Sequence, residues 1–153
     1  MSRAFVKEVE HETIDLPDRP VSMHPNLVTT EGLAAIERTL SRFEAANRGA
    51  IAKNDRRAIA ATQRELRYWN VRRSTAKVIE PVDDRTKVLF GTTVTVRRDD
   101  GRAQTFRIVG EDEAEPARGT LSYVSPLAHA VLGAMVGETV QAPGGGVTII
   151  EIK

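Results

Sequence analysis

The sequence predicts an α+β protein in which an antiparallel two-helix coiled coil precedes an antiparallel sheet domain with one short helix. Between residues 29 and 77, apolar side chains recur at steps of three and four, which is the period of a helix packed along one face. From residue 78 onward, β-branched residues alternate with polar ones between glycine-rich turns, as in antiparallel strands. We therefore expect an extended leader over 1–28, a helical hairpin over 29–77 and a sheet domain over 78–153.

The composition is that of a soluble globular chain. Hydrophobic residues make up 41% of the 153 residues and charged residues 28%, and no run reaches the roughly 18 to 20 apolar residues that a membrane-spanning helix needs. The first twelve residues are too acidic for a secretory signal peptide, so we expect a cytoplasmic protein that does not enter a membrane. The chain has no cysteine, and its three histidines are far apart. We therefore expect no disulfide, metal site or cofactor, and no metal-dependent enzyme activity.

The leader contains Pro17, Pro20 and Pro25 and shows neither a helical nor a strand period, which indicates extended chain. The first helix is predicted to begin at Thr29 or Thr30, because either hydroxyl can cap it. Its apolar stripe consists of Leu33, Ile36, Leu40 and Phe43. The stripe of the second helix consists of Ile59, Thr62, Leu66, Trp69, Arg73 and Ala76. The polar run at residues 49–55 predicts the turn between them. The alternative is that both helices lie as a layer over the sheet.

The sheet domain is predicted to open with a strand within residues 87–98, which a turn at residues 99–101 joins to a returning strand at 104–109. Ser125 and Pro126 indicate the start of a short helix, with serine at the cap and proline in the first turn, and Gly133 ends it. Two further strands, around Val140 and over 147–152, are joined through the turn at residues 143–146. The acidic run at 111–115 lacks the spacing of a calcium loop, so we interpret it as a solvated or partner-facing loop.

Four consecutive blocks of the sequence resemble the signature of the GreA/GreB C-terminal domain. They are Phe90–Val96, Phe106–Ala114, Ser125–Gly133 and Pro143–Gly145. Farther upstream, residues 30–33 resemble the opening of that family's first coiled-coil helix, and residues 76–79 resemble the exit from its second. The resemblance covers about residues 28–152 and leaves out only the leader.

The resemblance implies an FKBP-like C-terminal domain that binds the rim of the secondary channel of bacterial RNA polymerase, while the coiled coil reaches down the channel. Such a protein is an accessory that regulates transcription elongation, and the polymerase performs the chemistry. The residues that the resemblance implies as polymerase contacts are Ser125, Pro126, Leu127, Asp112 and Glu113. In the cleavage factors of the family, neighbouring acidic residues at the coil tip help to hold a second magnesium ion, which then supports hydrolysis of a backtracked transcript.

The predicted coil tip departs from that pattern. Where the cleavage factors carry an acidic run, this chain has Arg48, Lys53, Asp55, Arg56 and Arg57. A lone carboxylate among these cations would be paired with them instead of offering oxygens to a metal ion, which prefers several such ligands. Asp55 is thus a weak candidate for a catalytic role. We therefore predict a monomeric, Gre-like regulator without transcript-cleavage activity.

Other functions remain open. The chain could be a true cleavage factor that uses Asp55, with Glu44 as a second metal ligand, or a regulatory binding module similar to the short-coiled regulator Rnk. An FKBP-like prolyl isomerase is disfavoured because only seven aromatic residues are present. Residues 31–77 hold eleven Lys and Arg against five acidic residues, so contact with nascent RNA or DNA, or with an acidic surface of the polymerase, is also possible. Trp69 lies within a basic segment, but its place in the apolar stripe favours packing over nucleic-acid binding.

Overall fold

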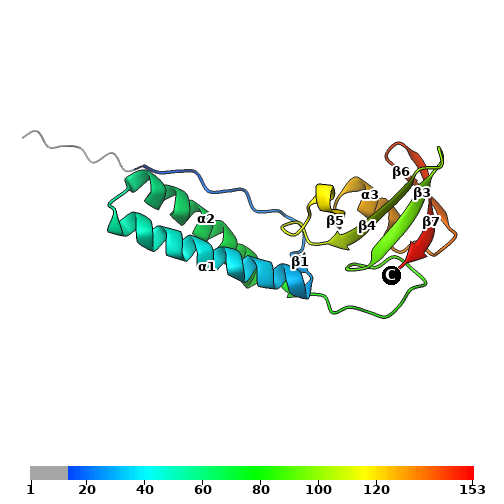
Figure 1. Ribbon diagram of the computed structural model, residues 1–153, viewed down its shortest axis with the longest axis horizontal. Coiled ribbons are helices and arrows are strands. Elements are labelled where there is room, and N and C mark those ends of the chain that lie inside the picture. Colours follow the sequence, from blue (N-terminus) through cyan, green and yellow to red (C-terminus); the bar gives the residue numbers. More distant parts are fainter. Residues whose placement is uncertain (1–13) are drawn as a thin grey trace, which may run out of the picture.

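The computed structural model describes residues 14–153, and the first thirteen residues of the predicted leader lie outside the described part. Helices α1 (Thr30–Ala52) and α2 (Arg56–Thr75) form an antiparallel hairpin that projects away from the sheet domain (Figure 1). The predicted α+β fold, with a helical hairpin before a sheet domain, is therefore confirmed. The alternative in which the helices cover the sheet is wrong. No helix within residues 14–153 is long and apolar enough to cross a membrane.

The seam of the hairpin follows the predicted stripes over most of its length. Thr29 Oγ1 accepts a hydrogen bond from Gly32 N at 2.9 Å and so caps α1. Ile36 and Leu40 are each only 2% exposed, and Leu66 and Trp69 pack against them. Trp69 therefore belongs to the packing, as its position in the stripe predicted.

The prediction fails at the base of α2, because Arg72 is buried and Arg73 is exposed. The strict alternation of steps places Arg73 in the seam. At this end of the helix, however, the buried face is turned toward the sheet domain as well as toward α1. Arg72 lies on that face, only 1% exposed.

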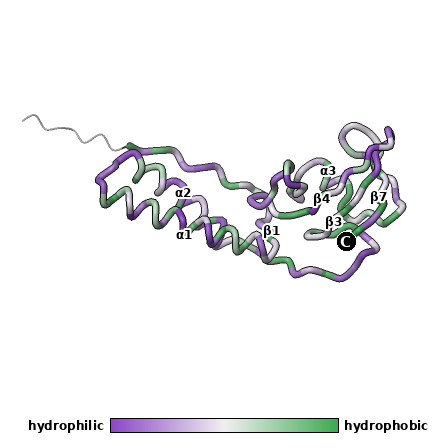
Figure 2. The backbone as a smooth tube through the Cα atoms, in the orientation of Figure 1, coloured by the Kyte–Doolittle hydropathy of each residue, from purple (hydrophilic) through white to green (hydrophobic). Residues whose placement is uncertain are grey.

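The turn at the free end of the hairpin is shorter than predicted. Helix α1 continues through Gly49 to Ala52, so only Lys53, Asn54 and Asp55 lie between the helices. Asn54 has a φ of 51°, in the left-handed region that asparagine tolerates better than most residues. Asp55 caps α2, with its Oδ1 accepting from Ala58 N at 3.1 Å. Figure 2 colours much of this end of the hairpin as hydrophilic.

The described part of the leader lies along α2 and then enters the junction between the hairpin and the sheet domain (Figure 1). Its last residues form β1 (Leu27–Val28), which pairs in parallel with β2 (Lys77–Val78) just after α2 ends. Residues 14–26 have no helix or strand, in agreement with the expected extended chain. The two-stranded pairing joins the start and the end of the hairpin at its base.

A five-stranded sheet with the order β5-β4-β3-β7-β6 forms the second part of the protein. Its strands are β3 (Thr93–Arg98), β4 (Ala103–Val109), β5 (Thr120–Ser122), β6 (Thr139–Ala142) and β7 (Gly145–Ile152). Most neighbours are antiparallel as expected, but β5 runs parallel to β4. Between these two strands the chain passes through the acidic loop and a short 3-10 helix, η1 (Pro116–Arg118). Strand β5 then begins beside Arg107 of β4 and runs in the same direction. That excursion replaces a hairpin turn and allows the parallel pairing.

The short helix α3 (Pro126–Val131) packs on the apolar face of the sheet. Val94 and Val96 on β3 are fully buried, and Phe106 lies opposite Val94 on β4. Val147 and Ile149 complete this face from β7, and Ala128 and Val131 cover it from α3. The alternating strand pattern thus places one apolar face against one helix, as the sequence predicted.

Candidate functional site

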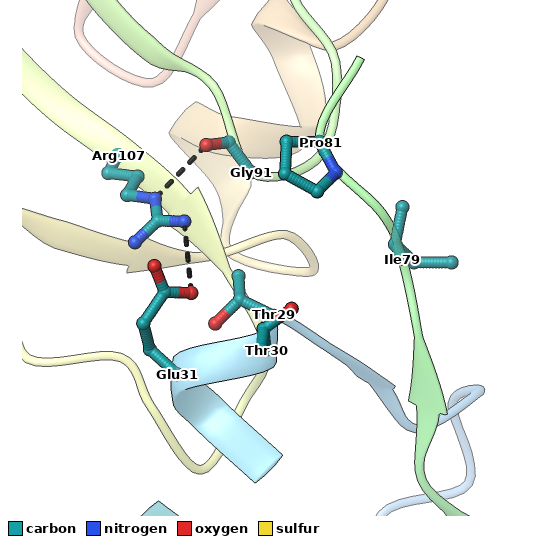
Figure 3. Close-up of a pocket in the computed structure, with 7 residues that line it drawn as sticks. All are labelled: Thr29, Thr30, Glu31, Ile79, Pro81, Gly91 and Arg107. Carbon is teal, nitrogen blue, oxygen red and sulfur yellow. Dashed lines mark hydrogen bonds and ion pairs between the residues drawn. The ribbon is translucent and has the colours of Figure 1, made fainter. Parts of the chain in front are cut away.

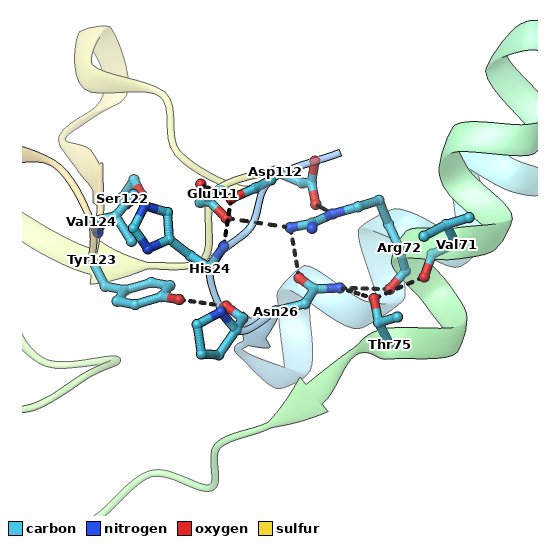
Figure 4. A network of polar contacts seen from close by, with 12 residues as sticks. His24, Asn26, Val71, Arg72, Thr75, Glu111, Asp112, Ser122, Tyr123 and Val124 are labelled. Atoms are coloured by element: carbon cyan, nitrogen blue, oxygen red, sulfur yellow. Dashed lines mark hydrogen bonds and ion pairs between the residues drawn. The ribbon is translucent and has the colours of Figure 1, made fainter. Parts of the chain in front are cut away.

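A buried polar network joins the base of the hairpin to the acidic loop after β4. Figure 4 shows the Arg72 guanidinium directed toward Asp112, Glu111 and Asn26. Its Nε donates to Asp112 Oδ2 at 2.5 Å, and its Nη2 donates to Asn26 Oδ1 at 2.8 Å. The same Nη2 lies 3.7 Å from Glu111 Oε2. The side chains of Arg72 and Asp112 are 2% and 10% exposed, so water contributes little to this pair.

Asn26 connects the leader to the end of α2. While its side-chain oxygen accepts from Arg72, its amide nitrogen donates to the Arg72 carbonyl at 2.7 Å and to Thr75 Oγ1 at 3.1 Å. One buried side chain therefore satisfies both the guanidinium and a carbonyl in the last turn of a helix, where intrahelical partners are lacking. A buried amide with unmet hydrogen bonds would be costly, and Asn26 avoids that cost only in this arrangement.

Tyr68 forms a hydrogen bond with the second carboxylate oxygen of Asp112. Its hydroxyl donates to Asp112 Oδ1 at 2.5 Å. Burial, reinforced by this carboxylate, raises the pKa of Tyr68 from 10.0 to about 12. The phenol is therefore neutral and able to donate at any physiological pH, and both oxygens of Asp112 are used within the chain.

Glu113, the other predicted acidic contact, lies against the start of α1. Both of its carboxylate oxygens accept from Thr29 Oγ1, at 2.8 and 2.6 Å. A Cβ built on Gly32 would lie 2.6 Å from Glu113 Oε2, and one on Gly110 would lie 2.3 Å from the Leu27 carbonyl oxygen. The second of these approaches is to backbone, so only glycine fits there. Both glycines belong to blocks that carried the family resemblance, and both lie where the hairpin meets the sheet domain.

A small pocket lies on another side of the same junction, and Figure 3 shows its lining. The residues are Thr29, Thr30, Glu31, Ile79, Pro81, Gly91 and Arg107. Arg107 Nη2 is 3.5 Å from Glu31 Oε2, and its Nε donates to the Gly91 carbonyl at 3.0 Å. A backbone hydrogen bond at the helix start, followed by the charge of Arg107, holds the pKa of Glu31 below its ordinary value. The side chain of Glu31 thus supplies the negative charge that the start of α1 and Arg107 favour.

The predicted polymerase contacts fall into two groups. Asp112 and Glu113 face the hairpin junction, whereas Ser125, Pro126 and Leu127 lie at the start of α3. Pro126 is exposed, and Leu127 is half-buried against the sheet core. Ser125 occupies the cap position, but its side chain makes no capping hydrogen bond, contrary to the sequence prediction. Its Oγ is buried and has no hydrogen-bond partner among the described residues.

The residues of the predicted coil tip gather at the free end of the hairpin, and all of them are exposed: Arg48, Lys53, Asp55, Arg56 and Arg57. Glu44 is also exposed, two turns of α1 before its end. Within residues 14–153 no three His, Cys, Asp or Glu side chains are grouped so that they could hold a metal ion. As arranged here, the tip is a cationic surface with a helix-capping carboxylate.

The network around Arg72 was not predicted from the sequence. Asn26, Arg72 and Asp112 belong to three different segments, and the Arg72–Asp112 pair spans 40 positions. Helical periodicity can indicate that one of two neighbouring arginines is buried, but it does not name the partner. The only usable signal was the acidic run at 111–115 beside a strand end.

Replacing Arg72 by alanine should destabilise the protein strongly. The change leaves the Asp112 carboxylate buried without its cation, which typically costs about 3–5 kcal/mol in free energy of unfolding. Arg73→Ala is the matched control, because Arg73 is adjacent but exposed, and it should change stability by no more than about 0.5 kcal/mol. Urea denaturation followed by circular dichroism measures both. Equal effects of the two substitutions would contradict the role assigned to the buried pair.

Tyr68 should also make stability depend on pH in the alkaline range. Because the fold raises its pKa from 10.0 to about 12, the fold favours the neutral phenol. This contribution is complete below the pKa of the unfolded chain and is lost as pH rises through the interval between the two values. The free energy of unfolding of Tyr68→Phe should therefore fall less steeply than that of the wild type above pH about 10. Some decline remains in the variant, since burial also raises the pKa of Tyr123. Urea titrations at several alkaline pH values compare the two, and parallel curves would rule out the contribution.

Residues 83–153 match the family described as transcription elongation factor, GreA/GreB, C-term. The transcription elongation factor GreA of Alkalilimnicola ehrlichii is 49% identical over 77 residues, covering 47% of this chain and 49% of that protein. The chain thus spans about half the length of this relative. GreB of Yersinia pestis is 32% identical over 152 residues, covering 84% of this chain and 88% of the relative. GreA of Legionella pneumophila is 31% identical over 158 residues, with 87% and 98% covered.

Solved structures that are similar to this chain include GreA factor homolog 1 of Thermus thermophilus, with a TM-score of 0.40 and 18% identity over 85% of this chain and 99% of the other. A GreA/GreB factor from Nitrosomonas europaea has the same TM-score and identity over 83% and 98% of the two chains. The sequence relatives carry the assignment, because two of them match at more than 30% identity over most of both chains. The chain belongs to the GreA/GreB family of transcription elongation factors.

Proposed function

We propose that this chain binds bacterial RNA polymerase at its secondary channel and modulates elongation without stimulating transcript cleavage. The observation that carries this proposal is the combination of a family-type sheet domain with a projecting hairpin whose free end is cationic. In this proposal the sheet domain over 78–153 docks on the channel rim, and the hairpin over 29–77 enters the channel. The chain acts in the cytoplasm as a monomer, and it is an accessory to the polymerase.

The start of α3 is the part of the sheet domain best suited to docking. Pro126 is exposed, and Ser125 Oγ is buried without a hydrogen-bond partner among the described residues. A buried hydroxyl without a partner is uncommon in folded proteins. Rotation of the Ser125 side chain toward the surface would let a polar group of the polymerase satisfy it, while Pro126 and Leu127 supply apolar contact. Asp112 and Glu113 contribute indirectly, because their oxygens hold the hairpin.

The charge of the tip supports regulation without cleavage. Asp55 accepts from the start of α2, with Lys53, Arg56 and Arg57 beside it in sequence. A magnesium ion prefers several oxygen ligands held together, and one capping carboxylate beside cations is a poor substitute. The same cations favour anionic surroundings, including the nascent RNA or the DNA of an elongation complex. The hairpin would then act by occupying the channel and altering pausing, backtracking or access of nucleotides.

Binding to purified core polymerase tests the docking surface. Wild-type protein should bind and should be displaced by a GreA cleavage factor, as measured by competition in fluorescence anisotropy. Pro126→Glu places a charge on the exposed docking surface and should weaken binding by about tenfold or more, equivalent to about 1.4 kcal/mol. Pro116→Glu is the matched control, since it makes the same change at an exposed proline that begins η1. Absence of binding by the wild type would favour the Rnk-like binding module instead.

True cleavage activity is the second candidate, and the exposed position of Asp55 at the free end of the hairpin favours testing it. We expect no shortening of RNA in backtracked complexes beyond that of polymerase alone. Asp55→Asn is the informative variant, because asparagine caps a helix about as well as aspartate but carries no charge. Shortened RNA with the wild type and none with Asp55→Asn would establish the cleavage function and disprove the proposal of a purely regulatory factor.

A further inference from the structure

The leader makes specific contacts along α2 that the family resemblance did not anticipate. We call residues 16–26 the strap. Arg64 Nε donates to the Pro17 carbonyl at 2.7 Å, and Arg67 Nε pairs with Asp18 Oδ1 at 2.5 Å. Arg67 Nη2 also reaches the Leu16 carbonyl at 3.5 Å. The strap is thus bound to the exposed side of α2 by side chains of two successive turns.

Arg19 contacts side chains of α2 in two different ways. Its Nη1 donates to Glu65 Oε2 at 2.7 Å, and its guanidinium carbon lies 3.8 Å from the centroid of the Tyr68 ring. A cation over an aromatic face at this distance is attracted by the ring quadrupole. Tyr68 in turn donates to Asp112, so a single residue, Tyr68, links Arg19 to the acidic loop of the sheet domain.

The other end of the strap contacts the sheet domain directly. Ser22 Oγ donates to Glu111 Oε1 at 2.8 Å, and the Tyr123 hydroxyl donates to the Pro25 carbonyl. Asn26 then binds Arg72, as described above. The strap therefore spans the junction, with its first half on the hairpin and its second half in contact with both the sheet domain and the base of α2.

The covalent connection between the two parts runs on the opposite side of the junction. Figure 1 shows residues 79–92 passing from β2 to β3 on the side away from the strap. Its first part, residues 80–87, is mostly exposed, with Val82 61% exposed, whereas Val88 belongs to the sheet core. A hairpin tied on one side only could tilt about its base. Ties on two opposite sides oppose such tilting in both directions.

We propose that the strap is a positioning element that fixes the angle between the hairpin and the sheet domain, with Arg19 as its principal positioning residue. Pro17, Pro20 and Pro25 restrict the strap to extended conformations, so less conformational entropy is lost when it binds. Exposed ion pairs such as Arg67–Asp18 are individually weak. Among the strap residues 16–19, which lie along the exposed side of α2, only Arg19 combines a partly buried ion pair with a ring contact, so its replacement should have the largest effect in this group. Only the use of this angle, to direct the hairpin into the channel, rests on the proposed function.

Distances between spin labels on the full chain test the proposal. The chain has no cysteine, so Gln63→Cys on α2 and Gln141→Cys on β6, both exposed, can be labelled selectively. Pulsed electron paramagnetic resonance should give one narrow distance distribution for the otherwise wild-type chain. Arg19→Glu places a carboxylate against Glu65, and we expect loss of the narrow distribution. Asp18→Lys, at a side chain that is 72% exposed, should broaden the distribution less and provides a variant with little risk to folding.

Arg118→Glu is the matched control, because it reverses an arginine in an exposed ion pair with Glu115, away from the strap. It should leave the distance distribution unchanged. Arg19→Lys retains the charge but lacks the planar guanidinium that both pairs with Glu65 and lies over Tyr68, so it should restore the distribution only in part. Circular dichroism of each variant confirms that the helices are retained. An Arg19→Glu variant that is folded and keeps the wild-type distribution would overturn the proposal, as would an equal effect of Arg118→Glu.

The outcomes separate this inference from the proposed function, since the distances are measured without polymerase. If the wild type does not bind polymerase while Arg19→Glu loses the narrow distribution, the proposed function fails and the strap stands. If Pro126→Glu abolishes polymerase binding while Arg19→Glu leaves the distances unchanged, the reverse holds.

Discussion

The buried ion pair between Arg72 and Asp112 holds the base of the hairpin against the sheet domain. Removing two charges from water costs several kcal/mol for each, and only good geometry with further hydrogen bonds compensates for it. Here Asp112 also accepts from Tyr68, while Arg72 also donates to Asn26. Any displacement of the base of the hairpin would separate these groups and leave charges buried without partners. The pair therefore contributes to the position of this base more than to net stability, and the angle of the hairpin about the base is left to contacts farther out.

The rest of the junction follows from the close approach that this pair requires. Gly110 lets the backbone of the loop after β4 approach the Leu27 carbonyl, and Gly32 leaves room for the Glu113 carboxylate at the start of α1. The short pairing of β1 with β2 closes the base of the hairpin beside them. The residues that carry the family resemblance therefore hold the hairpin against the sheet domain, in addition to any role on a surface that faces a partner.

Charge is distributed differently at the two ends of the hairpin. At the base, acidic side chains of the sheet domain pair with Arg72 and Thr29. At the free end, exposed arginines and a lysine surround an aspartate that caps α2. This separation suits a protein that is anchored at one end and presents a cationic surface at the other. The acidic residues near the junction are paired within the chain, whereas Asp55 at the tip is exposed and caps α2. The two groups therefore differ as candidates for metal binding.

The sequence by itself determined the class of the fold, the two helices, most strands and the family. Apolar periodicity and turn residues are local properties, and four ordered blocks are enough to identify a family. It did not determine which of Arg72 and Arg73 is buried, that β5 runs parallel to β4, or that the leader lies along α2. Nor did it indicate that Asp112 and Glu113 face the hairpin. Those features depend on pairs such as Ser22 and Glu111, which are 89 positions apart. Only tertiary packing brings such groups together, because local patterns specify which face of an element is buried and not what it is buried against.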